Sequence, residues 1–120
     1  MSTAGLQRGD VVVVNFTPTN PNATVRPALV IQNDRDNNRM ANTIVVQITS
    51  NTRRAAEDTQ LLIDQSHPDW SASGLHRPSA VNCSNIVTVK QHDVLHSIGS
   101  LSDATMAEID LCLKAALGIQ

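Results

Sequence analysis

Two positions in this sequence carry side chains that suit chemistry on a phosphodiester. Arg26 lies at the start of the apolar segment 25–32, and Thr49 with Ser50 follows the apolar segment 43–48. A guanidinium can neutralise the charge that builds on an attacked phosphorus, and a hydroxyl can donate to a non-bridging oxygen. Because threonine is a poor general base at its own pKa, we assign Thr49 a stabilising or orienting role.

Arg26 and Thr49 can act together only if the two segments are antiparallel neighbours in a sheet. The start of one strand then lies beside the end of the other, and the two residues share one rim. A simpler alternative remains open. Arg26 could pair with a loop carboxylate such as Asp34, and Thr49 could be an ordinary residue at a strand end. Residue chemistry alone favours this alternative, because both residue types are common.

The apolar segments predict a sheet of short strands, because runs of β-branched and aliphatic residues bounded by polar turns are typical of buried strands. We expect strands at 11–14, 25–32, 43–48 and 60–63, followed by two short strands or one bent strand at 79–83 and 86–90. The polar segments between them predict loops at 17–24 and 33–42 and an irregular stretch at 64–77.

The C-terminal segment predicts a helix. Ser102 can cap its start, Asp103 complements its dipole, and Gly118 stands where a C-cap glycine belongs. One apolar face is expected from Met106, Ile109, Leu113 and Leu117. Short strands and a terminal helix together predict a mainly β (α+β) fold, a small barrel packed by the helix, with residues 1–120 forming a single domain.

Composition limits how the chain could hold nucleic acid. It contains one Phe, one Trp and no Tyr, which leaves few rings for stacking bases. The formal net charge is −2, whereas proteins that bind nucleic acid by counterion release are usually basic. Positive charge must therefore be local. The segment 21–56 carries five arginines against two aspartates, and the segment 91–120 carries one lysine against four acidic residues.

The remaining polar and aromatic side chains give weaker indications. His92 and His96 would face the same way on a helix, but two ligands rarely hold a metal. We therefore prefer a surface pair and expect no metal or cofactor. His67 is interpreted as a loop residue, with contact to nucleic acid as the alternative. Trp70 is interpreted as a packing residue, with contact to a base or to a partner protein as the alternatives. No secretion signal or long apolar run is apparent, and reduced cysteines are expected, so a cytoplasmic location is the default expectation.

Six short motifs occur in an order that resembles the MazF/PemK (Kid) family of toxins. They are RGDVV (8–12), RPALVIQND (26–34), ITS (48–50), SAVNC (79–83), IVTV (86–89) and IGSLS (98–102). The ordered set runs from about residue 7 to the C-terminus and is more specific than any one motif. The resemblance implies an SH3-like barrel with a C-terminal helix, as in MazF and CcdB, that works as a homodimer.

The activity implied by the resemblance is metal-independent, sequence-selective cleavage of single-stranded RNA by an endoribonuclease toxin. The ribose 2′-hydroxyl would attack its own phosphate, leaving a 2′,3′-cyclic phosphate and a free 5′-hydroxyl. A cognate antitoxin protein would block the RNA groove, and any contact with DNA would be indirect, through that antitoxin.

The resemblance also assigns expected roles to residues. The family's functional arginine and strand-end threonine match Arg26 and Thr49, which we expect to be catalytic. RNA contacts are expected from Ser50, Arg53, Arg54, Asn15, Thr17, Asn82 and Ser84. The loop 17–24 lacks the Gly and Glu of many relatives, and Asn82 and Ser84 stand where some relatives carry an arginine and an acidic residue. The absence of that second pair narrows the expected active site to Arg26 and Thr49.

Two other functions are weighed against this one. CcdB, a toxin that poisons DNA gyrase, shares the barrel but ends in Trp-Gly-Ile, whereas this chain ends in Leu117-Gly118-Ile119-Gln120. A binding module without nuclease activity would fit the acidic net charge and the missing second pair. Fold alone does not transfer function, so the Arg-Pro and Thr-Ser motifs decide for the nuclease.

Overall fold

The strands of this protein form one antiparallel sheet whose spatial order differs from their order along the chain. The structure is a computed structural model that describes residues 5–22 and 24–120. Within these residues the sheet order is β4-β5-β3-β2-β1-β6. The strands are β1 (Asp10–Asn15), β2 (Val25–Val30), β3 (Asn42–Thr49), β4 (Gln60–Ile63), β5 (Ser79–Lys90) and β6 (Val94–Ser100). The expected mainly β fold with a terminal helix is confirmed.

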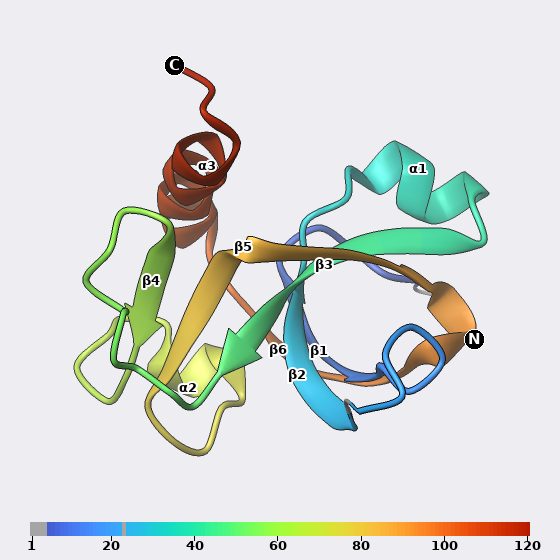
Figure 1. Cartoon of the computed structure of the whole chain (residues 1–120), viewed down its shortest axis with the longest axis horizontal. Helices are drawn as coiled ribbons and strands as arrows, with labels where there is room; N and C mark the ends of the chain where they lie inside the picture. The colour runs from blue at the N-terminus through green and yellow to red at the C-terminus, as the bar shows by residue number, and fades with distance from the viewer. Residues whose placement is uncertain (1–4, 23) are drawn as a thin grey trace.

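The sheet curls strongly, and its two ends are bridged by the segment that follows β4 (Figure 1). That segment holds the one-turn helix α2 (Trp70–Ser73), which packs on β6. A Cβ added to Gly74 would lie 2.0 Å from the carbonyl oxygen of Ile98, and one added to Gly99 would lie 2.2 Å from that of Ala72. The two backbones can approach this closely only because both positions are glycine.

Two aliphatic cores lie on opposite faces of the sheet. One packs α3 (Asp103–Leu117) against the sheet through Met106, Ile109 and Cys112, and the other surrounds Phe16. Trp70 is half-buried and packs against the first core, so the preferred interpretation of this residue as a packing residue is confirmed. No helix among the described residues combines the length and the apolar character needed to cross a membrane.

The predicted ends of α3 are confirmed, but its predicted apolar face is wrong at one position. The Ser102 hydroxyl accepts from the Thr105 N–H at 3.3 Å, and Gly118 adopts φ 71° as the C-cap. Leu117 is 58% exposed, because the buried stripe runs at spacings of three through Met106, Ile109 and Cys112 and turns away from it. The end of the chain accordingly projects away from the sheet in Figure 1.

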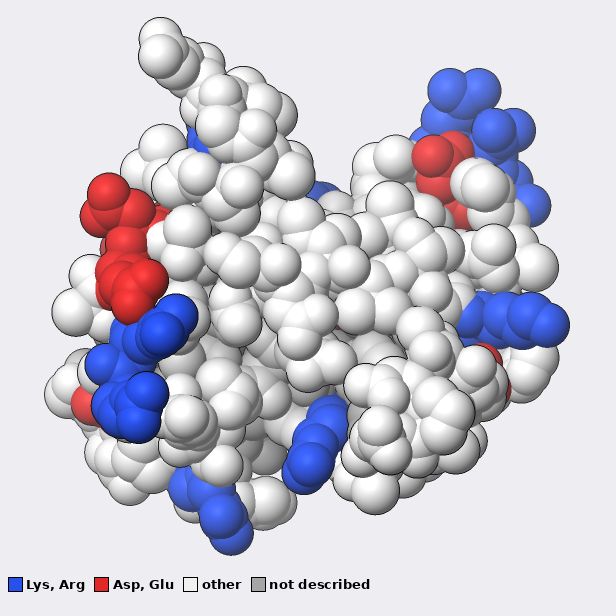
Figure 2. Space-filling view, in the orientation of Figure 1, with Lys and Arg blue, Asp and Glu red and all other residues white. Residues whose placement is uncertain are grey.

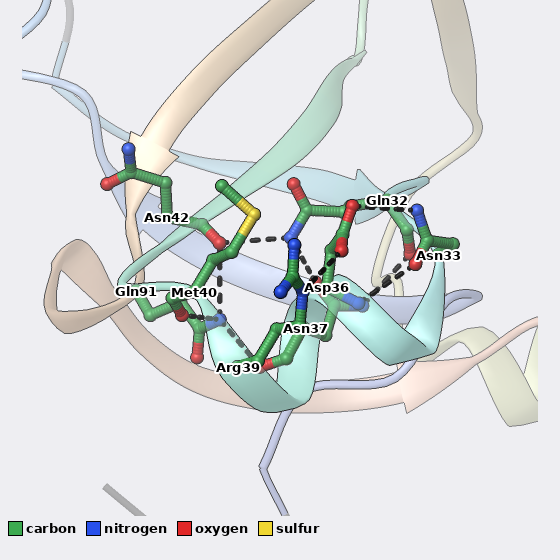
Figure 3. A network of polar contacts seen from close by, with 8 residues as sticks. All are labelled: Gln32, Asn33, Asp36, Asn37, Arg39, Met40, Asn42 and Gln91. Carbon is green, nitrogen blue, oxygen red and sulfur yellow. Dashed lines mark hydrogen bonds and ion pairs between the residues drawn. The ribbon is translucent and has the colours of Figure 1, made fainter.

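The expected polar loop at 33–42 is instead a short helix, α1 (Asp34–Arg39). The Asn33 side chain caps it by accepting from the Asp36 N–H at 2.9 Å. Buried amides then fix it to the sheet. Gln32 Nε2 donates to Asn37 Oδ1 at 2.9 Å, and Gln91 Nε2 donates to the Asn37 carbonyl at 2.9 Å (Figure 3). Gln91 is distant from α1 in the sequence, and Gln32 lies just before it. The helix propensity of residues 34–39 alone therefore did not predict α1.

Other predictions of elements need smaller corrections. The irregular stretch at 64–77 contains α2, and β2 ends at Val30 rather than at residue 32. Residues 79–90 form one strand with a register shift opposite Val46 and Gln47, which is the bent alternative. The strand β6 was not predicted, because as an edge strand paired only with β1 it lacks a regular apolar alternation. Ala23, within the predicted loop at 17–24, and residues 1–4 of the expected domain lie outside the described residues.

Candidate nucleic-acid interface

Arg26 and Thr49 line the same cleft, where β2 begins and β3 ends. The two strands are antiparallel, with Ala28 paired to Gln47. The paired part of the two strands ends there, and Arg26 and Thr49 each lie two residues beyond it. Both residues line a cleft of about 560 Å³, so the geometric expectation that they share a rim is confirmed.

The cleft combines an apolar floor with polar walls. Its apolar surface comes partly from Val13, Ile48 and Leu75. The opposite wall is the segment after α2, which brings His76 and Arg77 to the same cleft. Because the tight contact of Gly74 with β6 fixes where this segment begins, the bridge between the sheet ends also positions the wall. Neither His76 nor Arg77 belongs to a local sequence pattern that indicates a functional residue.

The alternative in which Arg26 pairs with Asp34 is not what the structure shows. The Asp34 carboxylate accepts from the backbone N–H of Arg8 at 2.6 Å. Within residues 5–22 and 24–120 no ion pair to Arg26 is present, and the side chain is exposed. Its guanidinium is thus available to an anion in the cleft.

A second pocket of about 260 Å³ opens on the other side of Thr49. It is lined by Gln47, Thr49, Asn51, Arg53, Arg54, Gln60, Asn82 and Asn85. Three of the expected RNA-contacting residues, Arg53, Arg54 and Asn82, therefore join Thr49 here, and Ser50 lines the first cleft. Arg53 and Arg54 are exposed, and Arg54 Nε lies 3.8 Å from the Glu57 carboxylate.

The other expected contact residues lie outside these two pockets. Ser84 is exposed on the irregular part of β5, and its N–H donates to Asn82 Oδ1 at 3.1 Å. Asn15 ends β1, and its side chain accepts from the Thr17 N–H at 3.1 Å. The loop that follows contributes Thr19, Asn20 and Asn22 to a third pocket, of about 310 Å³, which Arg26 and Gln47 also line.

The basic residues of 21–56 do not form one patch. Arg35 and Arg39 belong to α1, whereas Arg53 and Arg54 follow β3. Figure 2 shows basic side chains at the upper right, over α1, at the right edge, and separately on the lower left and along the lower edge, toward the end of β3. Of these four arginines, only Arg53 and Arg54 line one of the pockets described above.

The two histidines considered as a metal pair lie in different elements. His92 belongs to the 3-10 turn η1 (Gln91–Asp93), with Nε2 3.3 Å from Asp93 Oδ1, and His96 lies in β6. In the part of the chain that the structure describes, no group of three potential metal ligands is present. His67 lies in the turn before α2, as expected of a loop residue, and its Nδ1 accepts from the Asp69 N–H at 3.0 Å.

Solved structures that share this architecture include a bacterial toxin and an endoribonuclease bound to its antitoxin. The Mycobacterium tuberculosis toxin MazF-mt6 superposes with a TM-score of 0.76 and 21% identity, covering 92% of this chain and 98% of that one, a likeness of fold. A mycobacterial endoribonuclease solved in complex with its cognate antitoxin gives a TM-score of 0.74 and 25% identity, covering 96% of this chain and 97% of that one. The fold is thus that of a small β-rich toxin.

The sequence comparison identifies the family. Residues 7–117 match the model of the PemK-like, MazF-like toxins of type II toxin–antitoxin systems, and the chain belongs to this family. The Bacillus subtilis endoribonuclease EndoA is 30% identical over 95% of this chain and 96% of its own length. The M. tuberculosis endoribonuclease MazF6 is 35% identical over 78% of this chain and 79% of its own length. The resemblance found in the motifs is therefore confirmed.

Proposed function

We propose that this chain is the endoribonuclease toxin of a type II toxin–antitoxin system, and that it cleaves single-stranded RNA in the cleft between Arg26 and Thr49. Family membership and the endoribonuclease relatives support the activity. The observation that carries the assignment of the site is that an exposed arginine and a threonine, at the ends of two neighbouring antiparallel strands, line one cleft. Residues 1–120 would act as one toxin domain.

Cleavage within RNA needs no external nucleophile. The ribose 2′-oxygen forms a bond to the adjacent phosphorus, and the bond from phosphorus to the 5′-oxygen breaks. The 2′-hydroxyl gives up its proton, and the departing 5′-oxygen takes one up. Arg26 would neutralise the charge on the phosphorane, and the Thr49 hydroxyl would donate to a non-bridging oxygen. This mechanism requires no metal or cofactor.

A proton acceptor is still required for the 2′-hydroxyl. Asn82 and Ser84 cannot supply it, because neither side chain titrates near neutral pH. Among the residues that line the cleft, His76 carries the imidazole suited to exchange a proton there. We assign this role to His76, as the group that compensates for the missing second pair.

The partners follow from the same proposal. A relative has been solved with its cognate antitoxin, and we propose a protein antitoxin that covers this cleft, with any DNA contact made through that antitoxin. We also propose a homodimer and a cytoplasmic location. The gyrase-poisoning alternative is not favoured, because the family model and the curated relatives named here belong to the MazF/PemK group.

The test is cleavage of a long RNA in EDTA, with analysis of the new ends. The wild-type chain should leave 2′,3′-cyclic phosphates. Arg26→Ala should lower the cleavage rate by about 10²- to 10³-fold, the usual effect of removing one transition-state donor. His76→Gln should lower it by about 10²-fold or more. Arg35→Ala, an exposed arginine on α1, is the matched control and should cleave normally. Intact RNA with the wild-type chain, or full activity in Arg26→Ala, would overturn the proposal.

A further inference from the structure

Three carboxamide side chains stand in a row across neighbouring strands beside the cleft. Gln60 of β4 pairs with Asn82 of β5, and Asn82 pairs on its other side with Gln47 of β3. Residues paired in register lie on the same face of a sheet with their Cβ atoms about 5 Å apart. All three line the 260 Å³ pocket, which we call the carboxamide pocket.

The lining of the carboxamide pocket favours an uncharged polar ligand over a phosphate. Amide groups dominate it, no carboxylate or aromatic ring lines it, and its only charged groups are Arg53 and Arg54. Amides offer donors and acceptors together, which matches the edge of a nucleobase. With no ring for stacking, recognition must come from hydrogen bonds to that edge.

One polar atom of Gln60 lacks a partner. Gln60 Oε1 is buried and accepts no hydrogen bond within the described residues. A buried oxygen without a hydrogen-bond donor destabilises the folded protein. Because no hydrogen bond holds it, rotation of the terminal amide can present the oxygen to a ligand without breaking one. Asn82 Oδ1 already accepts from the Ser84 N–H, which leaves the Asn82 amino group as a donor.

We propose that the carboxamide pocket binds an unpaired adenine next to the scissile phosphate and so sets the sequence preference of cleavage. The exocyclic amino group of adenine would donate to Gln60 Oε1, and a ring nitrogen would accept from the row of amides. Carboxamides are the side chains that match adenine in two hydrogen bonds, whereas arginine is the usual partner of guanine. The proposal rests on the proposed RNA cleavage.

The position of the pocket supports this assignment over a separate ligand site. Thr49, Asn51 and Gln47 line both the carboxamide pocket and the cleft that contains Arg26. A nucleotide whose phosphate lies between Arg26 and Thr49 therefore has its neighbour's base within reach of the amide row. Arg53 and Arg54 are then available to the phosphate that follows.

The experiment is cleavage of a randomised RNA pool, with the cut sites read by sequencing. The wild-type chain should enrich adenine at one position beside the cut. Gln60→Leu should lower that enrichment roughly ten-fold and leave the other positions unchanged, since a matched amide–base contact discriminates by about this factor. Asn82→Asp, which keeps the oxygen that accepts from Ser84, should also lose it. The matched control Gln65→Leu, an exposed glutamine outside the pocket, should keep the wild-type profile.

The results of this experiment distinguish a failure of the pocket assignment from a failure of the proposed function. Intact RNA with the wild-type chain overturns both. Wild-type cleavage with an unchanged profile in Gln60→Leu, or with a base other than adenine at the affected position, overturns the pocket assignment alone. Thermal unfolding provides a further readout. Gln60→Leu should be as stable as the wild type, because it removes an unpaired buried oxygen, whereas a purely structural role would lower the melting temperature.

Discussion

Asp69 accepts two hydrogen bonds from Ser102, one from the backbone N–H at 2.8 Å and one from the hydroxyl at 2.9 Å. Asp69 immediately precedes α2 and Ser102 is the N-cap of α3, so this contact ties the bridge between the sheet ends to the start of the terminal helix. It brings together segments 33 residues apart.

This contact predicts a dependence of stability on pH. Burial raises the pKa of Asp69, but hydrogen bonds from Ser102 and Thr105 outweigh it, so the pKa lies below its ordinary value of 3.8. A depressed folded-state pKa gives stability that is present above 3.8 and is lost as the pH falls through the folded value. Asp69→Asn should therefore lower the unfolding free energy at pH 7 by about 1–2 kcal/mol, with the difference shrinking in acid. Denaturant unfolding from pH 2 to 7 measures it, and a difference independent of pH would contradict the assignment.

The contact between Gly74 and Ile98 predicts a site that tolerates no side chain. Gly74 has φ 72° and an added Cβ would meet the Ile98 carbonyl. Gly74→Ala should cost more than about 2 kcal/mol, since it combines left-handed strain with a backbone clash. Gly118→Ala is the matched control, because φ is 71° but nothing lies within 4 Å, so only about 1 kcal/mol is expected. Equal losses of melting temperature in the two variants would show that packing on β6 contributes nothing.

The amide of Gln91 predicts that α1 depends on a residue far along the chain. Its Nε2 donates to the carbonyls of Asn37, Met40 and Asn42 at 2.9, 3.0 and 3.2 Å (Figure 3). Gln91→Leu leaves these carbonyls without that donor and should cost about 2–3 kcal/mol. Hydrogen exchange should accelerate at the amides of α1 more than at those of α3. Gln65→Leu at the surface should change neither, and unchanged exchange in Gln91→Leu would exclude the role assigned to this amide.

The two cysteines predict slow thiol chemistry. Burial, with the neighbouring Cys112, raises the pKa of Cys83 to about 12. Burial also raises the pKa of Cys112. Because the thiolate is the reactive form, both should resist a disulfide reagent at pH 7 in the folded protein and react fully in denaturant. Rapid labelling of the native protein would contradict this burial.

Much of the fold followed from local sequence. The aliphatic runs at 11–14, 43–48 and 60–63 form strands, because β-branched and aliphatic side chains favour strands that are buried against a core. The two caps of α3 were readable because capping depends on neighbours a few residues away. By contrast, α1 and β6 depend on distant partners, Gln91 and β1, and their own residues carried too little periodicity to reveal them.

The candidate site also has a part that the sequence indicated and a part that only the tertiary structure decided. The sequence by itself indicated the family through its ordered motifs, and the same motifs made Arg26 and Thr49 the candidates for chemistry on a phosphodiester. Only the tertiary structure decided that the carboxamides of Gln47, Gln60 and Asn82 form one row and that His76 joins the cleft. The physical reason is that strand register depends on long-range pairing and on the shift opposite Val46, which no short window of sequence encodes.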